Sequence, residues 1–251
     1  MDLARLVGVE PALPGGANLI GHARDGVRAN RAVHLLARRI GEGVAALAAA
    51  GQVIVDGPLA AKVDQRYDHM RTLEARFTQT YSGAGINRTE SGTLLMKKPG
   101  RMRWDYDQPR PKLFLTDGHN AWFYVPGEKQ VRRTPVKQLD DLRSPLRYLL
   151  GKTKLEKELD GLSLAPDQKP LNPGDVVLRG IPKGMGDRVE QTLLEVAPDG
   201  LLSRIVVEER DGSVTEFRFL QQRENVEVPD GQFRFTPPPG TEVVAGTELT
   251  E

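Results

Sequence analysis

The sequence of 251 residues contains no cysteine. This absence excludes disulfide bonds, thiol nucleophiles, zinc sites built from cysteine, and a lipid anchor on an N-terminal cysteine. The sequence also lacks any run of about 18 apolar residues, so we predict no membrane-spanning helix. Neither charge dominates, since 35 basic and 34 acidic side chains leave a formal net charge of +1. We therefore expect no nucleic-acid partner.

Side-chain patterns typical of enzymes are also missing. There is no G-x-S-x-G nucleophile turn, and the glycines of 180–186 lack the Lys-Ser/Thr ending of a phosphate-binding loop. Asp and Glu mostly alternate with apolar residues, which is typical of the solvated face of a strand. The four histidines lie far apart without metal-ligand spacing: they are His22, His34, His69 and His119. We predict no catalytic residue, no metal and no cofactor, and hence a protein that is not an enzyme.

The first 57 residues differ in composition from the rest of the chain. They are rich in Ala, Gly and Arg, and no large aromatic residue occurs before Tyr67. Arg38 and Arg39 precede the apolar stretch Ile40–Ala50, which has the layout of a secretory signal although Glu42 interrupts it. Two explanations stay open: a start codon placed too early in front of a signal, or a leader that is not cleaved. We predict a leader over 1–57, a folded domain over 58–245 and a tail over 246–251.

An amphipathic helix is expected at the start of the folded domain. Pro58 suits the first turn of a helix. The apolar residues that follow recur at the spacing of one helix face, and they are Leu59, Val63, Tyr67 and Met70.

After this helix the periodicity changes to two, which predicts half-buried strands. Met102, Trp104 and Tyr106 alternate with charged residues. The same alternation occurs in the pairs Leu113 and Leu115, Trp122 and Tyr124, Phe217 and Phe219, and Phe233 and Phe235. Asp-Gly pairs, which suit tight hairpin turns, occur at Asp117-Gly118, Asp199-Gly200, Asp211-Gly212 and Asp230-Gly231. We predict a long antiparallel meander that curls into a barrel-like sheet covered by a few helices, with a sandwich as the alternative.

One segment, from about Val136 to Glu158, breaks the strand pattern. Ser144 followed by Pro145 is a good helix start, and Gly151 is a good helix end. Because a short apolar helix between strands must cover something, we predict a lid that carries Leu146, Tyr148, Leu149 and Leu150.

Four segments in series resemble the LolA family of outer-membrane lipoprotein carriers. Leu73–Thr80 is similar to the family's first strand with its Phe-Thr-Gln signature, and Gly92–Trp104 to its G-x-L-x-x-(K/R)-(K/R)-P-x-x-(F/M)-x-W hairpin. Leu115–Pro126 resembles the family's (S/T)-D-G-x-x-x-W-x-Y hairpin, and Asp230–Pro237 its closing F-x-F-x-P strand. The order and spacing of the four segments agree with the family over about 58–244.

The resemblance implies a mainly β fold with a few helices, in which an unclosed antiparallel β-barrel is lidded by short helices. Its concave apolar face receives the acyl chains of a lipoprotein. Leu94 and Met96 share one strand face and Leu95 takes the other, and the sequence does not decide which face is concave. A plain core role is the alternative for the aromatic residues. We expect the cavity to be lined by Leu94, Met96, Met102, Trp104, Leu113, Leu115, Trp122 and Tyr124.

Lys98 departs from the family pattern. It stands where the family commonly has an arginine that holds the lid helices through hydrogen bonds, and lysine keeps the charge but loses the planar fork of donors. Lys97 is a second candidate for this latch. The alternative is a solvated lysine at the end of a hairpin.

The resemblance further implies a monomeric periplasmic protein whose partners are acylated lipoproteins, an inner-membrane ABC transporter of the Lol type and an outer-membrane receptor. The related membrane-anchored receptor is disfavoured for this chain, because it needs a lipidated cysteine. Two other functions stay open: a barrel that binds or senses lipids or glycolipids without transferring lipoproteins, and a lipid hydrolase with an unrecognised carboxylate site.

Overall fold

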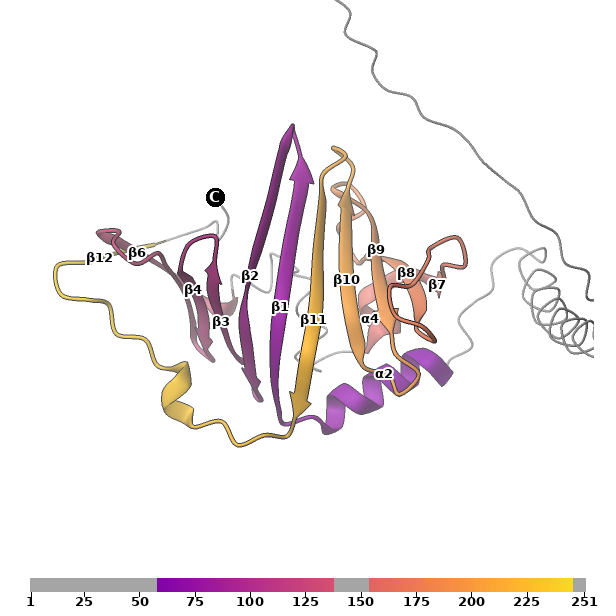
Figure 1. Ribbon diagram of the computed structural model, residues 1–251, viewed down its shortest axis with the longest axis horizontal. Helices are drawn as coiled ribbons and strands as arrows, with labels where there is room; N and C mark the ends of the chain where they lie inside the picture. Colours follow the sequence, from indigo (N-terminus) through magenta and orange to yellow (C-terminus); the bar gives the residue numbers. More distant parts are fainter. Residues whose placement is uncertain (1–57, 138–153, 246–251) are drawn as a thin grey trace, which may run out of the picture. The chain divides into compact units, whose positions relative to one another are not determined.

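The computed structural model describes residues 58–137 and 154–245 (Figure 1). The predicted leader and tail lie outside these ranges. So do the predicted lid residues Leu146, Tyr148, Leu149 and Leu150.

The described part of the chain contains one 12-stranded sheet with the order β12-β6-β5-β4-β3-β2-β1-β11-β10-β9-β8-β7. The strands are β1 (Thr72–Gly83), β2 (Ile86–Lys97), β3 (Arg101–Gln108), β4 (Lys112–Asp117), β5 (Asn120–Tyr124), β6 (Gln130–Pro135), β7 (Leu159–Leu164), β8 (Val176–Pro182), β9 (Val189–Val196), β10 (Leu202–Glu209), β11 (Val214–Glu224) and β12 (Glu242–Ala245). Neighbouring strands are antiparallel except for β12, which pairs with β6 in parallel. Because β7 and β12 are the two edges of the sheet that these residues form, the sheet is unclosed, as predicted, and it is not a sandwich.

The predicted amphipathic helix is present as α2 (Pro58–His69). Val63 and Tyr67 are buried, Leu59 packs against the core from a partly buried position, and Met70 is buried just beyond the last turn. This helix lies at the end of the sheet where β1 begins, and the β1–β2 turn lies at the opposite end (Figure 1). A short second helix, α4 (Leu155–Glu158), packs against α2 and leads directly into β7. None of the helices in the described ranges is long and apolar enough to span a membrane.

Different segments of the chain pack against the two faces of the sheet. We call the face that packs against α2 the inner face; it carries Phe77, Leu94, Met102 and Trp104, which form one buried cluster with the apolar residues of α2 and α4. We call the opposite face the outer face. Residues opposite each other in neighbouring strands point to the same side of a sheet, so the register assigns every strand residue to one face or the other. Burial of each large inner-face side chain stabilises the fold by roughly 1.5–3 kcal/mol.

Three of the four predicted Asp-Gly turns join neighbouring strands. They connect β4 to β5, β9 to β10 and β10 to β11, and their glycines, Gly118, Gly200 and Gly212, all have positive φ. Asp230-Gly231 is different, because it lies in the 3-10 helix η2 (Asp230–Phe233). There Asp230 forms ion pairs with Lys97 and Arg101. The Asp-Gly dipeptide therefore anchors the segment that follows β11 and does not form a hairpin turn.

The prediction of a strand around Phe233 and Phe235 is therefore wrong. Because β1 and β10 already flank β11, the chain has no free neighbouring edge to join when it leaves β11. It crosses the outer face of the sheet, where Phe233 is buried and Phe235 packs against Trp122 and Tyr124, before β12 pairs with β6. We call residues 225–237 the C-terminal strap.

Candidate functional site

Four of the predicted cavity residues lie together on the inner face. Leu94 is opposite Trp104, and Met96 is opposite Met102, so the β2–β3 hairpin presents all four toward α2. All four side chains are buried. Aromatic rings surround Trp104 edge-on, with ring centroids 4.8 Å away at Phe77, 5.8 Å away at Phe217 and 6.2 Å away at Phe219. The centre of the inner face is therefore a continuous aromatic and aliphatic surface.

The other four predicted cavity residues lie on the outer face. Leu115 is opposite Trp122 and Leu113 is opposite Tyr124, and the C-terminal strap covers this surface. The register thus divides the eight predicted residues between two faces. Leu94, Met96, Met102 and Trp104 are on the inner face, in one buried cluster with α2, and the other four are on the outer face. Phe114 and Phe123 take the inner positions in the β4–β5 hairpin. The sequence shows their alternation with the other four residues, but the family motif contains Trp122 and Tyr124 and neither phenylalanine.

Lys98 contacts the last turn of α2. Its Nζ donates to the carbonyl oxygen of Tyr67 and, at 3.3 Å, to that of Asp68. These carbonyls have no partner within the helix, and a cation at this end also favours the helix dipole. Burial lowers the pKa of the Lys98 ammonium, although Asp68 opposes the shift. The structure therefore places Lys98 at the last turn of α2.

Lys97 points the other way. Its Nζ donates to the carbonyl oxygen of Val228 at 2.6 Å and pairs with the carboxylate of Asp230 at 2.6 Å. Both partners belong to the C-terminal strap. Lys97 thus holds the strap against the outer face.

Polar contacts tie α2 to its surroundings at several points. Arg66 Nε donates to Glu224 at 2.7 Å, and its NH1 pairs with Asp199 at 2.8 Å. The Tyr67 hydroxyl oxygen accepts a hydrogen bond from the backbone N–H of Leu202 at 3.2 Å. The buried carboxylate of Asp64 accepts one from the backbone N–H of Leu155, the first residue of α4. The helix is thus joined to β10, β11 and α4, and sequence periodicity indicated none of these contacts.

The inner face becomes polar toward the β1–β2 turn. Glu90 and Lys112 form an ion pair at 2.6 Å, and Lys112 Nζ lies 4.2 Å from the ring centroid of Tyr106. The Tyr106 hydroxyl donates to Gln79 Oε1 at 2.7 Å. Burial raises the pKa of Tyr106, and the nearby carboxylate of Glu90 adds to the shift. The inner face is therefore apolar at the α2 end and polar at the other.

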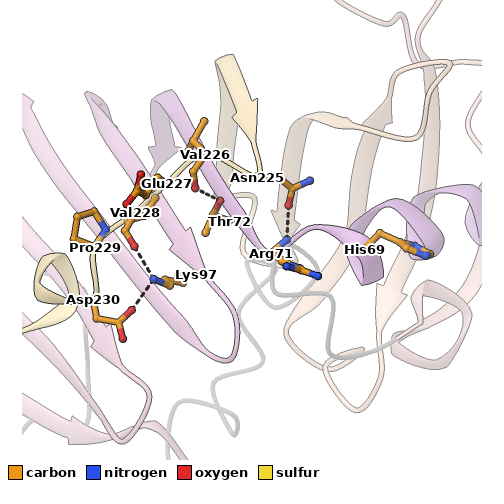
Figure 2. Close-up of a pocket in the computed structure, with 10 residues that line it drawn as sticks. All are labelled: His69, Arg71, Thr72, Lys97, Asn225, Val226, Glu227, Val228, Pro229 and Asp230. Atoms are coloured by element: carbon orange, nitrogen blue, oxygen red, sulfur yellow. Dashed lines mark hydrogen bonds and ion pairs between the residues drawn. The ribbon is translucent and has the colours of Figure 1, made fainter.

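A pocket of about 700 Å³ lies outside this apolar surface (Figure 2). It is bounded by the end of α2, the start of β1 and the C-terminal strap. Figure 2 shows how Thr72, Lys97 and the backbone of Arg71 hold the strap through hydrogen bonds to Val226, Val228 and Asn225. Seven of its ten lining residues have polar or charged side chains, and none of the ten belongs to the buried cluster around Trp104.

The model of the family "Outer membrane lipoprotein carrier protein LolA" matches residues 68–236. The chain belongs to the LolA family. An outer-membrane lipoprotein carrier protein of Chromobacterium violaceum is 30% identical over 213 residues, which cover 84% of this chain and 96% of that protein. A protein of the same name from Nitrosospira multiformis is 29% identical over 182 residues, which cover 71% of this chain and 84% of that protein.

One solved structure shows a similar fold. An uncharacterised conserved protein from Thermus thermophilus matches with a TM-score of 0.50 and 13% identity, over 76% of this chain and 98% of that one. LolA proteins are carriers, and this membership confirms the prediction that the chain is not an enzyme. The chain is a carrier of the LolA type. Its first two motif segments, Leu73–Thr80 and Gly92–Trp104, lie in β1 to β3.

Proposed function

We propose that this chain binds the acyl chains of lipoproteins against its inner face and carries them through the periplasm from the inner to the outer membrane. The observation that carries this proposal is the apolar surface around Trp104, which forms one buried cluster with the apolar residues of α2. Burying each methylene of an acyl chain is worth about 0.8 kcal/mol, so a lipoprotein with several long chains needs such a surface to cross water.

Cargo binding requires a rearrangement, because the inner-face side chains are already buried. Leu94, Met102 and Trp104 are each no more than 4% exposed, so acyl chains reach them only when the helix cover separates from the sheet. A carrier that must also release its cargo needs closed and open states of similar free energy, with cargo favouring the open one. The polar contacts of α2 and Lys98 set the stability of the closed state.

The proposal includes partners on both sides of the periplasm. An inner-membrane ABC transporter of the Lol type would load the carrier at the expense of ATP, and an outer-membrane receptor would accept the cargo from a monomeric carrier. Residues 1–57 would then direct export. N-terminal sequencing of the chain recovered from a periplasmic fraction tests this part, and recovery from the cytosol with Met1 intact would contradict it.

A transfer assay tests the central claim. Purified protein is incubated with liposomes that hold a triacylated lipoprotein and the transporter, and the soluble fraction is assayed for a complex of the two proteins. We expect the acylated lipoprotein to become soluble with the carrier, while a form of the same lipoprotein without its acyl chains does not associate. Failure to solubilise the acylated form would exclude the proposal.

Mass spectrometry of ligands that copurify with the chain separates this function from its alternative. Bound phospholipid or glycolipid, together with a negative transfer assay, would indicate a LolA-fold lipid-binding protein that does not transfer lipoproteins. Turnover of an ester by the purified chain would instead point to a hydrolase.

A further inference from the structure

Polar residues on four strands of the inner face lie at one level near the β1–β2 turn. Cross-strand neighbours link Thr192 of β9 through Val207 to Thr215 of β11, and then Tyr81 of β1 to Arg88 of β2. These residues therefore share both a face and a level of the sheet. The ion pair of Glu90 and Lys112 lies beside this row. We call the set Tyr81, Glu90, Arg88, Lys112, Thr192 and Thr215 the polar rim.

Two atoms of the polar rim are buried and lack a hydrogen-bond partner among the described residues. They are Oγ1 of Thr192, a side chain with 0% exposure, and Nε of Arg88. The carboxylate oxygen of Glu90 that pairs with Arg88 Nε is 3.7 Å away, beyond hydrogen-bond distance. An unsatisfied buried polar group costs about 1–3 kcal/mol, so two at one level of one face call for an explanation.

The chemistry of the two atoms defines a ligand. Arg88 Nε can only donate a hydrogen bond, and the Thr192 hydroxyl has a proton to donate. Both therefore suit acceptor oxygens. Arg88 and Lys112 both pair with the carboxylate of Glu90, and carbonyl oxygens can accept from the donors that these pairs leave unused.

The position of the rim agrees with the geometry of an acylated peptide. From Met96, at the α2 end of β2, to Arg88 is about 26 Å at roughly 3.3 Å per residue, a span suited to an extended acyl chain. The apolar centre around Trp104 lies between these two points. A chain that lies along this surface with its methyl end near α2 brings its carbonyl end to the rim.

We propose that the polar rim binds the ester and amide carbonyl groups that join the acyl chains of a lipoprotein to its N-terminal residue. This inference rests on the proposed function and adds an orientation to it. The acyl chains extend toward α2, and the peptide leaves the carrier near the β1–β2 turn.

The test measures binding of a synthetic triacylated lipopeptide and of diphenylhexatriene, a hydrocarbon probe without carbonyl groups. Thr192→Val keeps the shape of the side chain and removes the hydroxyl, and Arg88→Met removes the donors of Arg88. The matched control is Thr78→Val, on the outer face of the same sheet. We expect each rim variant to bind the lipopeptide about two- to tenfold more weakly, which corresponds to one net hydrogen bond. Both variants should bind diphenylhexatriene as the wild type does, and Thr192→Val should unfold at an equal or higher temperature.

Infrared spectra of a lipopeptide with 13C-labelled carbonyl groups provide a second readout. We expect a lower carbonyl frequency in the wild-type complex than in the complexes of the two rim variants. Equal lipopeptide affinity of wild type and both variants, or an equal loss of both probes, would overturn the inference while leaving the proposed function intact. A wild-type chain that binds no lipopeptide and transfers no lipoprotein would overturn both.

Discussion

The carboxylate of Asp64 accepts a hydrogen bond at 3.0 Å from the backbone N–H of Leu155, a residue 91 positions later in the chain, and so joins α2 to α4. Asp64 is only 9% exposed. Burial raises the pKa of its carboxyl group; the Leu155 N–H and Lys154 oppose this shift, and Asp68 and Glu156 add to it. The contact between α2 and α4 therefore depends on a carboxyl group that ionises less readily in the folded chain than in the unfolded one.

Protonation of Asp64 should stabilise the folded chain. The folded-state pKa lies above the ordinary value of 3.8, so at neutral pH ionised Asp64 lowers the free energy of unfolding. This penalty is relieved as the pH falls through the folded pKa toward 3.8. Asp64→Asn keeps an acceptor oxygen for Leu155 and cannot ionise. We expect the wild type to gain stability relative to this variant between about pH 7 and pH 4, as measured by urea unfolding. A stability difference that does not change with pH would contradict the assignment.

Lys98 should stabilise the closed position of α2. Lys98→Met keeps an apolar stem and removes the donors to Tyr67 and Asp68, and we expect a loss of about 1–2 kcal/mol with faster hydrogen exchange in α2. Lys98→Arg should retain most of the stability, since it keeps charge and donors. The matched control is Lys97→Met, which should loosen the C-terminal strap and leave hydrogen exchange in α2 unchanged. The same change in α2 for both methionine variants would argue against a specific latch.

Gly92 should tolerate no side chain. A Cβ at this position would lie 2.0 Å from the carbonyl oxygen of Asp105 and 2.9 Å from the ring of Phe77. The clash is with the backbone of β3, which cannot move without breaking the register, so Gly92→Ala should cost roughly 3 kcal/mol or more. Gly231→Ala is the control, because a Cβ there meets nothing within 4 Å. Urea unfolding of the two variants checks this expectation, and equal stabilities would refute it.

The alternation of apolar residues predicted which side chains share a face, but not which face is inner. Leu94, Met102 and Trp104 share one face, and Leu115 and Trp122 share another, as the period of two requires. Both faces of β2 to β5 carry apolar side chains: those of the inner face in β2 and β3 belong to the buried cluster that includes α2, and those of the outer face in β5 pack against the C-terminal strap. The sequence did not predict that the C-terminal strap packs on the outer face, because the alternation around Phe233 is also typical of a strand.

Contacts between distant segments were beyond prediction for a related reason. The role of Asp64 depends on the position of Leu155. The different partners of Lys97 and Lys98 depend on the side of the sheet to which each side chain points at the end of β2. Motif spacing placed both lysines at the end of a hairpin. Lys98 contacts α2 and Lys97 contacts the C-terminal strap because these two segments pack on opposite faces of the sheet.

The two tryptophans of the chain allow a direct test of which face binds acyl chains. Trp104 lies at the centre of the inner face with 1% exposure, whereas Trp122 lies on the outer face, where its Nε1 donates to Asp117 at 3.1 Å. Trp122→Phe leaves only the inner-face indole as a fluorescent reporter, and Trp104→Phe leaves only the outer-face one. A lipopeptide with brominated acyl chains quenches indoles that it contacts.

We expect this lipopeptide to quench the fluorescence of Trp104 strongly and that of Trp122 weakly, because acyl chains that replace the cover of the inner face come into contact with Trp104 alone. Circular dichroism shows whether both variants keep the β fold, and an unbrominated lipopeptide controls for changes in polarity. Strong quenching of Trp122 with little effect on Trp104 would place the acyl chains on the outer face. It would also remove the basis for the orientation inferred from Thr192 and Arg88, since both residues point to the inner side.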